Sequence, residues 1–255
     1  MTKIIAFANQ KGGVGKTTTA INIGASLAAI KKRVLLVDLD PQGNAGTGLG
    51  FVRASYRQNV YDVLINGAPA AENILTTAVA GMHILPSSPK LSGAEVELLD
   101  MDNREYRLRD ALFAVAAHYD YILLDCPPAL GYLSLNALTA ADNVIVPLQC
   151  EFFALEGLQH LTNSISEIRK KWNPELEILG VLLTMYDKRN ALSKAVEDDV
   201  RAAARVRVFK TVVPRNTRVA EAPSHGKPAL FYDFNSPGAQ AYLRVATEIV
   251  EALGE

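Results

Sequence analysis

Apolar residues along the chain fall alternately into short continuous runs and into longer stretches with helical spacing. The continuous runs are rich in Val, Ile and Leu, which is typical of strands that are buried on both faces of a parallel sheet. They predict strands at residues 3–9, 33–38, 82–85, 121–125, 143–147, 178–184 and 208–213. Spacing of three and four residues predicts helices at residues 17–30, 105–118, 133–140, 154–171, 191–204 and 239–253.

The order of these elements indicates the class of fold. Strands and helices alternate without a long linker, a repeat or a low-complexity segment. This order predicts a single α/β domain over residues 1–255, with a doubly wound, mostly parallel sheet and helices on both faces. Ligands of such sheets bind beyond the C-terminal ends of the strands. The residues that follow each strand are therefore the first candidates for chemistry.

Composition narrows the class of protein without indicating its chemistry. The chain has 255 residues, of which 49% are hydrophobic, and a formal net charge of −1, so it is expected to fold. Its apolar stretches fall short of the roughly 18–20 residues of a membrane-spanning helix. The first residues do not resemble a signal peptide. Two cysteines, Cys126 and Cys150, favour a reducing compartment and are expected in the core. A cytoplasmic location is the expectation.

Charge is unevenly distributed along the chain. Residues 188–227, here called the basic block, contain 10 Lys and Arg against 4 Asp and Glu, whereas residues 1–187 contain 15 against 19. Such a block is either a surface for a polyanionic partner or the solvated face of one or two helices. The charge count alone leaves both interpretations open.

A glycine-rich segment, KGGVGKTT at residues 11–18, joins the first predicted strand to the first predicted helix. Glycines allow backbone N–H groups to turn toward phosphate oxygens, and the helix N-terminus adds a partial positive charge. Lys16 is placed to reach the β- and γ-phosphates, and the Thr17 hydroxyl to coordinate Mg²⁺. The loop has Gln10 where the usual phosphate-loop pattern has its first glycine, and it contains a second lysine, Lys11. Its position between strand and helix favours a phosphate site over a chance glycine-rich turn.

Two aspartates follow strands that are predicted to flank this loop. Asp125 ends the run at residues 121–125, and Asp40 lies just beyond the run at residues 33–38. Asp125 is the better candidate for holding the hydration shell of Mg²⁺, and Asp40 is placed to orient an attacking water. Either aspartate alone could equally be a helix N-cap. Their combination with the phosphate loop favours the functional interpretation.

Several separated segments resemble one known family. The loop at residues 11–18 is similar to the deviant Walker A motif, with its signature lysine, of the ATPases that include ParA/Soj, MinD and the nitrogenase iron protein. Residues 37–50, 123–131, 147–158 and 214–228 closely resemble the ParA/Soj chromosome-partitioning ATPases, and the likeness covers nearly the whole chain. The resemblance implies ATP and Mg²⁺ as cofactors and an ATP-bound sandwich homodimer. It also implies slow ATP hydrolysis that a ParB-type centromere-binding partner stimulates.

The resemblance implies a role for each residue of the site. Lys11 would reach the nucleotide of the facing protomer, Lys16 would contact the phosphates of its own nucleotide, and Asp40 would organise hydrolysis. The implied metal residues are Thr17 and, through water, Asp125. The implied nucleotide-binding residues are Lys11, Gly12, Gly13, Val14, Gly15, Lys16, Thr17 and Thr18, with Pro214, Arg215 and Asn216 lining the adenine. Gly12 matches a glycine that must stay small where two protomers approach. Thr18 matches a threonine that contacts the α-phosphate.

The resemblance also gives the basic block a use. Arg189 and Arg218 match arginines of a surface for non-specific double-stranded DNA, and Lys188 is a further candidate. The resemblance thereby implies a cytoplasmic protein that associates with the nucleoid. It leaves open whether the protein partitions a chromosome or a plasmid. Aromatic residues are not interleaved with the basic ones, which favours contacts to the duplex backbone over stacking on single strands.

Other functions share the phosphate loop. A positioning ATPase for another nucleoid-borne cargo would differ only in its adaptor. A MinD-like ATPase that cycles on membranes should end in a basic amphipathic helix, but residues 239–255 contain one Arg and three Glu. A protein that binds nucleotide without hydrolysing it is disfavoured by the presence of Lys11, Asp40 and Asp125.

Overall fold

The computed structural model describes residues 2–254, and its centre is one seven-stranded sheet. The strands lie in the order β3-β4-β2-β5-β1-β6-β7, and neighbouring strands are parallel except for the antiparallel pair β3–β4. The predicted doubly wound α/β fold is confirmed. The strands are β1 (Lys3–Phe7), β2 (Val34–Asp38), β3 (Leu75–Thr76), β4 (Met82–Leu85), β5 (Tyr121–Asp125), β6 (Asn143–Gln149) and β7 (Glu177–Thr184).

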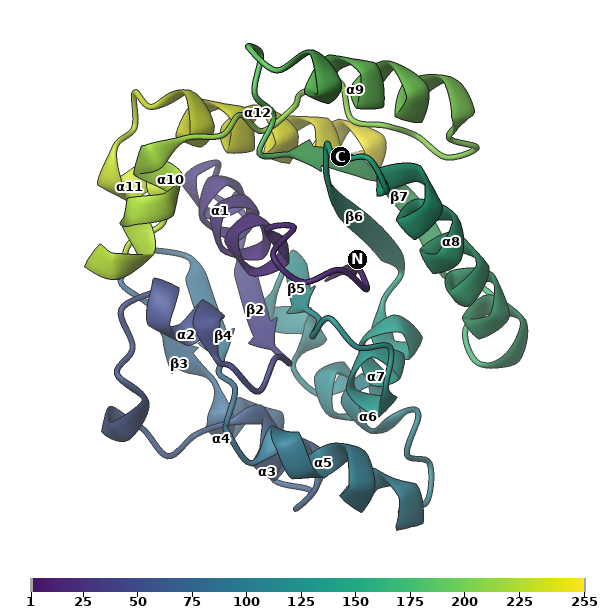
Figure 1. Cartoon of the computed structure of the whole chain (residues 1–255). Helices are drawn as coiled ribbons and strands as arrows, with labels where there is room; N and C mark the ends of the chain where they lie inside the picture. The colour runs from purple at the N-terminus through teal and green to yellow at the C-terminus, as the bar shows by residue number, and fades with distance from the viewer. Residues whose placement is uncertain (1, 255) are drawn as a thin grey trace.

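Helices cover both faces of this sheet (Figure 1). In Figure 1, α8 and α9 lie on the side of β6 and β7, whereas α3, α4 and α5 lie at the opposite end of the molecule. The helices are α1 (Lys16–Ala29), α2 (Asn44–Gly48), α3 (Val60–Leu64), α4 (Ala70–Asn73), α5 (Leu91–Glu97), α6 (Arg107–Phe113), α7 (Tyr132–Ala140), α8 (Ala154–Lys171), α9 (Ala191–Ala203), α10 (Thr217–Glu221), α11 (Ala229–Tyr232) and α12 (Pro237–Ala252).

The alternation of side chains along each strand divides the core into two layers. In β2, Leu35 and Val37 join the layer under α3 and α5 to α9, whereas Val34 and Leu36 join the layer under α1 and α12. Both sets are fully buried. This is why the strands appear in the sequence as continuous apolar runs and not as an alternating pattern.

The predicted strand at residues 208–213 is wrong. Residues 207–215 run beside β7 and form two isolated bridges, Val181–Val208 within β7 and Tyr186–Pro214 just beyond its end. Between these points the backbone N–H groups of Lys210 and Thr211 donate to the Glu248 carboxylate of α12, at 2.8 and 2.9 Å. A side chain distant in sequence therefore takes the hydrogen bonds that a continuous strand would make.

The helix predicted at residues 105–118 is shorter in the structure. Residues 107–113 form α6, and a separate 3₁₀ turn spans Ala116–His118. The start is delayed because side chains of α7 bind the preceding carbonyls. Asn136 donates to the carbonyl of Arg104, and Thr139 donates to that of Glu105.

Candidate nucleotide site and basic surface

The glycine-rich loop leaves β1 and enters α1 at the C-terminal edge of the sheet. Gly13 and Gly15 have φ angles of 76° and 86°, in the left-handed region that favours glycine. Gly15 is the N-cap of α1, and within residues 2–254 no side chain caps the first turn of this helix. Backbone N–H groups at the helix N-terminus therefore remain available to an anion such as phosphate.

Two polar side chains that sequence reasoning missed anchor this loop to neighbouring strands. The Asn9 amide donates to the carbonyl of Pro147 in β6 at 2.8 Å, and its oxygen accepts the N–H of Lys11. The hydroxyl of Thr184, the last residue of β7, donates to the carbonyl of Val14 at 2.8 Å. Asn9 follows a buried strand and Thr184 ends one. Their positions at strand ends were the feature of the sequence that could have identified both residues.

Lys16 begins α1 with its side chain almost completely buried. Its ammonium group donates to the carbonyl of Lys11 at 3.3 Å. Burial lowers the pKa of Lys16, and the nearby carboxyls of Asp125 and Asp40 oppose this shift. A phosphate would supply the negative charge that such a desolvated cation favours.

The strands β2 and β5 end in two aspartates that are partners in the sheet register, Asp38 and Asp125. Both are fully buried. Neither oxygen of Asp125 has a hydrogen-bond partner within the described residues. Burial and the charge of Asp38 raise the pKa of Asp125 well above its usual range, and the nearby Thr17 hydroxyl opposes this shift. An unpartnered buried carboxylate beside a threonine hydroxyl fits the hydration shell of Mg²⁺.

Asp38 is the acidic residue that sequence reasoning missed. One of its oxygens accepts the N–H of Asp40 at 3.2 Å, and the other accepts the N–H groups of Ala45 and Gly46 at 3.1 and 3.4 Å. Burial raises the pKa of Asp38 to about 7, although these backbone N–H groups lower it. The signal was present, since Asp38 ends a buried apolar run just as Asp125 does.

A cavity of about 440 Å³ brings most of the predicted phosphate residues together. It is lined by Gly12, Gly13, Gly15, Lys16, Thr17, Thr18, Ile21, Asp40, Asn44, Thr47, Gly48, Pro128, Met185 and Pro223. Val14 is buried beneath the loop instead. Asp40 uses one carboxylate oxygen to accept the N–H of Gln42 at 2.9 Å.

A second hollow of about 550 Å³ contains the predicted adenine segment. It is lined by Tyr186, Asp187, Lys188, Arg189, Pro214, Arg215, Asn216, Thr217 and Ala220. The two hollows are neighbours, because the consecutive residues Met185 and Tyr186 line one each. The side-chain oxygen of Asn216 accepts the N–H of Val219 and caps α10, so this oxygen is already engaged.

Lys11 lies apart from this cavity. Its side chain is about half exposed and forms an ion pair with Glu151, from the loop between β6 and α8. The adjacent Gly12 has open space around it, since within residues 2–254 no atom outside Lys11, Gly12 and Gly13 lies within 4 Å of where a Cβ would be. Its φ is not positive either, so packing within one chain does not require a glycine there.

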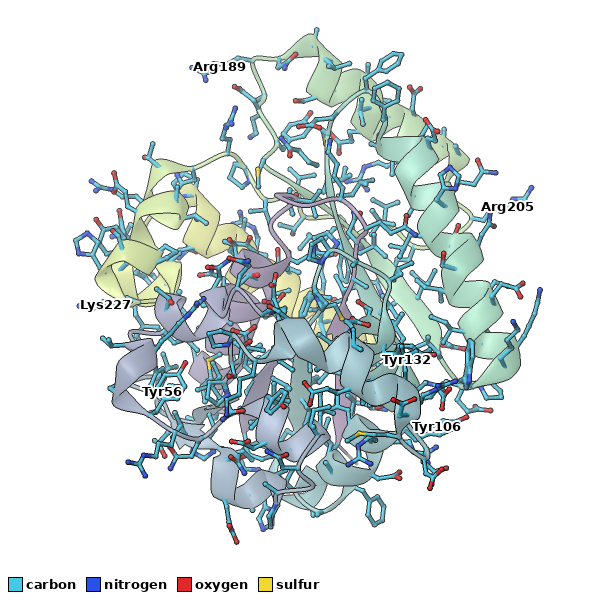
Figure 2. All side chains as sticks on the ribbon, turned by 60° about the horizontal axis from the view of Figure 1, so that its bottom comes forward. Tyr56, Tyr106, Tyr132, Arg189, Arg205 and Lys227 are labelled. Atoms are coloured by element: carbon cyan, nitrogen blue, oxygen red, sulfur yellow. The ribbon has the colours of Figure 1, made fainter. Side chains whose placement is uncertain are left out.

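The three predicted DNA residues are exposed, and the two arginines among them are already paired with carboxylates. The Arg189 side chain is 90% exposed and binds Asp187 through two hydrogen bonds of 3.0 and 3.1 Å. Arg218 pairs with Glu221 at 3.1 Å and with Asp233 at 3.4 Å. Figure 2 shows Arg189, Arg205 and Lys227 projecting from three separate parts of the molecular outline. The basic block is therefore spread over the surface and not gathered in one cluster.

The fold and the glycine-rich loop define a P-loop nucleotide-binding protein that carries a second lysine in the loop. A sequence model of the family described as an AAA domain matches residues 2–178. The chain is 55% identical to the chromosome partitioning protein ParA of Caulobacter vibrioides, over 97% of this chain and 94% of that protein. It is 53% identical to the sporulation initiation inhibitor protein Soj of Bacillus subtilis, over 98% of each. The chain belongs to the ParA/Soj family.

Among solved structures, the fold matches cobyrinic acid a,c-diamide synthase from Mycobacterium smegmatis with bound ADP and magnesium. The TM-score is 0.88 and the sequence identity is 39%, over 99% of this chain and 96% of that chain. The likeness extends over the whole sheet and its helices, and it confirms the predicted P-loop architecture.

Proposed function

We propose that this chain is an ATPase that partitions chromosomes or plasmids, with ATP and Mg²⁺ as cofactors. The observation that carries the proposal is the group formed by Lys16, Thr17 and the unpartnered carboxylate of Asp125. A buried cation and a buried carboxylate at the end of a phosphate loop suit a nucleoside triphosphate with its metal. The relatives named as chromosome-partitioning proteins and the solved neighbour with ADP and magnesium support the same conclusion.

The residues divide the work of phosphoryl transfer among them. Backbone N–H groups of residues 12–16 and the Lys16 ammonium group bind the phosphates, and Thr18 lies beside the α-phosphate. Thr17 and, through water, Asp125 hold Mg²⁺, which neutralises phosphate charge when bound. Asp40 orients the attacking water, and Pro214, Arg215 and Asn216 line the adenine. The chemistry is mainly positioning and charge neutralisation.

ATP-dependent homodimerisation completes the proposed site. Lys11 does not line its own cavity, and Gly12 is exposed although no contact among the described residues requires its small size. Both observations suit a face that another copy approaches, with Lys11 leaving Glu151 for the nucleotide of the facing protomer. Hydrolysis then requires the dimer, so that ATP controls assembly.

The basic block supplies the proposed surface for non-specific double-stranded DNA, through Arg189, Arg218 and Lys188. A dimer doubles this surface, so the dimer should bind DNA much more tightly than the monomer does. A ParB-type centromere-binding partner stimulates hydrolysis and releases the protein from the nucleoid in the cytoplasm.

Binding to random-sequence duplex DNA tests the proposal most directly. The measurement is made with ATP, with ADP and without nucleotide, across a salt series. Binding that requires ATP, is independent of sequence and weakens with salt is expected. Binding without any nucleotide dependence would remove the coupling between dimer and DNA from this proposal.

The Asp40→Ala variant tests the proposed hydrolytic role. It should still bind ATP and dimerise, and it should remain on DNA because hydrolysis no longer releases it. Hydrolysis at the wild-type rate in this variant would exclude the role proposed for Asp40.

The main alternative function is that of a positioning ATPase for another nucleoid-borne cargo, because such a protein would differ only in its adaptor. The membrane-cycling alternative has less support. The apolar face of α12 is already covered, since Tyr242, Val245 and Ile249 are buried in the core layer shared with α1. Within residues 2–254 no helix combines the length and the apolar character needed to cross a membrane.

A further inference from the structure

We infer that Asp38 is a positioning residue, whose single carboxylate clamps both ends of the loop at residues 40–46 and so holds Asp40 at the phosphate cavity. The inference rests on the proposed ATPase function, because it concerns the loop that carries the proposed hydrolytic aspartate. It adds a residue and a role that differ from the metal role proposed for Asp125.

The hydrogen bonds of Asp38 define the clamp. One oxygen accepts the N–H of Asp40, where the loop begins, at 3.2 Å. The other oxygen accepts the N–H groups of Ala45 and Gly46, in the first turn of α2, at 3.1 and 3.4 Å. Residues seven and eight positions after Asp38 are thereby tied to the same side chain as a residue two positions after it.

The rigidity of the clamp follows from its position. Asp38 is fully buried at the end of a central strand, with β4 and β5 paired on its two sides. The loop that it holds turns at Gly43, which has a φ of 60°. A second contact comes from outside the loop, since the Ser87 hydroxyl donates to the Asp40 carbonyl. The start of the loop is thus fixed at both the N–H and the C=O of Asp40.

The two buried aspartates therefore differ in what their oxygens do. Both oxygens of Asp38 are occupied by backbone N–H groups, whereas both oxygens of Asp125 have no partner within the described residues. Two acidic side chains at adjacent strand ends thus have separate tasks. Asp125 keeps its oxygens available to the hydration shell of a metal, and Asp38 orders the loop.

The Asp38→Asn variant is the sharpest probe because it keeps the size of the side chain. Its amide nitrogen can only donate, so one end of the clamp faces backbone N–H donors without an acceptor. We expect amide hydrogen exchange to become faster at residues 40–46 in the protein without nucleotide. The catalytic rate constant for ATP hydrolysis should fall about 10- to 100-fold, while Mg-ATP affinity changes less than about threefold.

The Asp120→Asn variant is the matched control. It makes the same substitution at the residue just before β5, at the opposite end of the neighbouring strand. It should leave both the exchange of residues 40–46 and the hydrolysis rate unchanged. The wild type supplies a measurement that needs no variant: the amides of Asp40, Ala45 and Gly46 should exchange at least about tenfold more slowly than expected for an unstructured chain.

Three results would overturn the inference. Unprotected amides at Asp40, Ala45 and Gly46 in the wild type would show that the clamp does not exist in solution. A loss of Mg-ATP affinity with an unchanged rate constant would assign Asp38 to ligand binding. Faster exchange throughout the chain of Asp38→Asn would make its role one of general folding. If the wild type hydrolyses no ATP, the proposed function fails, and protection of the three amides would still support the clamp itself.

Discussion

The strand pair β2 and β5 has a carboxylate at each edge of the sheet, and the two edges are built in opposite ways. At the N-terminal edge of the sheet, Asp120 accepts the backbone N–H and the guanidinium of Arg33, in bonds of 2.7 Å each. Arg33 lowers the pKa of Asp120 to about 2. At the C-terminal edge, Asp38 and Asp125 are buried side by side, and burial raises the pKa of each.

The difference separates a structural charge from one for which a function is proposed. The Arg33–Asp120 pair is partly exposed and complete within the chain, so it has no need of a ligand. Asp125 differs, because both of its oxygens are buried without a hydrogen-bond partner within residues 2–254. Burying these carboxyls is unfavourable, and packing in the rest of the core must offset it. The unfavourable burial occurs at the place where phosphate and metal are proposed to bind.

Lys16→Ala should have the largest effect, because Lys16 is the buried cation nearest to these carboxylates. The variant removes the positive charge and leaves the carboxyls to repel the phosphates. We expect Mg-ATP binding to weaken at least about 100-fold, and ATP-dependent DNA binding to disappear. Isothermal titration with a non-hydrolysable ATP analogue measures the first effect. Affinity within threefold of the wild type would exclude the phosphate role of Lys16.

Asp125→Asn should separate stability from function. Without ligand, the variant removes an ionisable carboxyl whose burial is unfavourable, so the free energy of unfolding should rise by about 1–2 kcal/mol. With Mg-ATP, the wild type should gain stability that the variant does not. Urea unfolding with and without Mg-ATP measures both effects. A less stable apo variant would mean that the Asp125 carboxyl is satisfied in the unliganded protein.

Arg189→Ala and Arg218→Ala should each weaken DNA binding by about 3- to 10-fold and reduce the dependence on salt, while ATP-dependent dimerisation is unchanged. The effect is moderate because each arginine must first leave the carboxylates that it binds in the free protein. A titration of duplex DNA at several salt concentrations measures both quantities. Arg109→Ala is the control, since Arg109 forms a comparable exposed pair with Asp110 on α6.

Asp120→Asn should have the smallest effect. Because the pKa of Asp120 is lowered in the folded state, its pairing stabilises the protein above about pH 4, and that contribution is lost as the pH falls toward 2. At neutral pH the variant should lower the melting temperature by only about 2 °C, because the pair is partly exposed. Melting curves between pH 3 and 7 should converge for variant and wild type at the acid end. A decrease of more than about 8 °C would contradict this assignment.

The sequence predicts the candidate site best where it is local. Residues 11–18 are contiguous, and Asp125 at a strand end and Asp40 just beyond another are candidates without any tertiary information. Asn9 and Thr184 are different, since their hydrogen-bond partners lie 138 and 170 positions away. Their roles depend on which strands become neighbours, and a linear pattern does not contain that order.

Two other features depend on contacts between distant segments. The segment at residues 208–213 has the apolar pattern of a strand, but Glu248 on α12 takes its backbone donors. From the sequence, Arg218 is predicted to be a cation available to DNA. In the fold it pairs with Asp233, which lies fifteen residues later. Apolar periodicity predicts which segments become buried, whereas it does not predict which polar groups then satisfy one another.

The irregular path of residues 207–215 also bears on aggregation. A regular strand at that place would present a long row of unpaired backbone groups, a template onto which another chain could add. Instead, the segment contacts β7 at separated points and bends away between them. The opposite border is β3, which has only two residues. Both borders of the sheet are thus poor templates, which should keep copies of the protein from joining strand to strand at high local concentration.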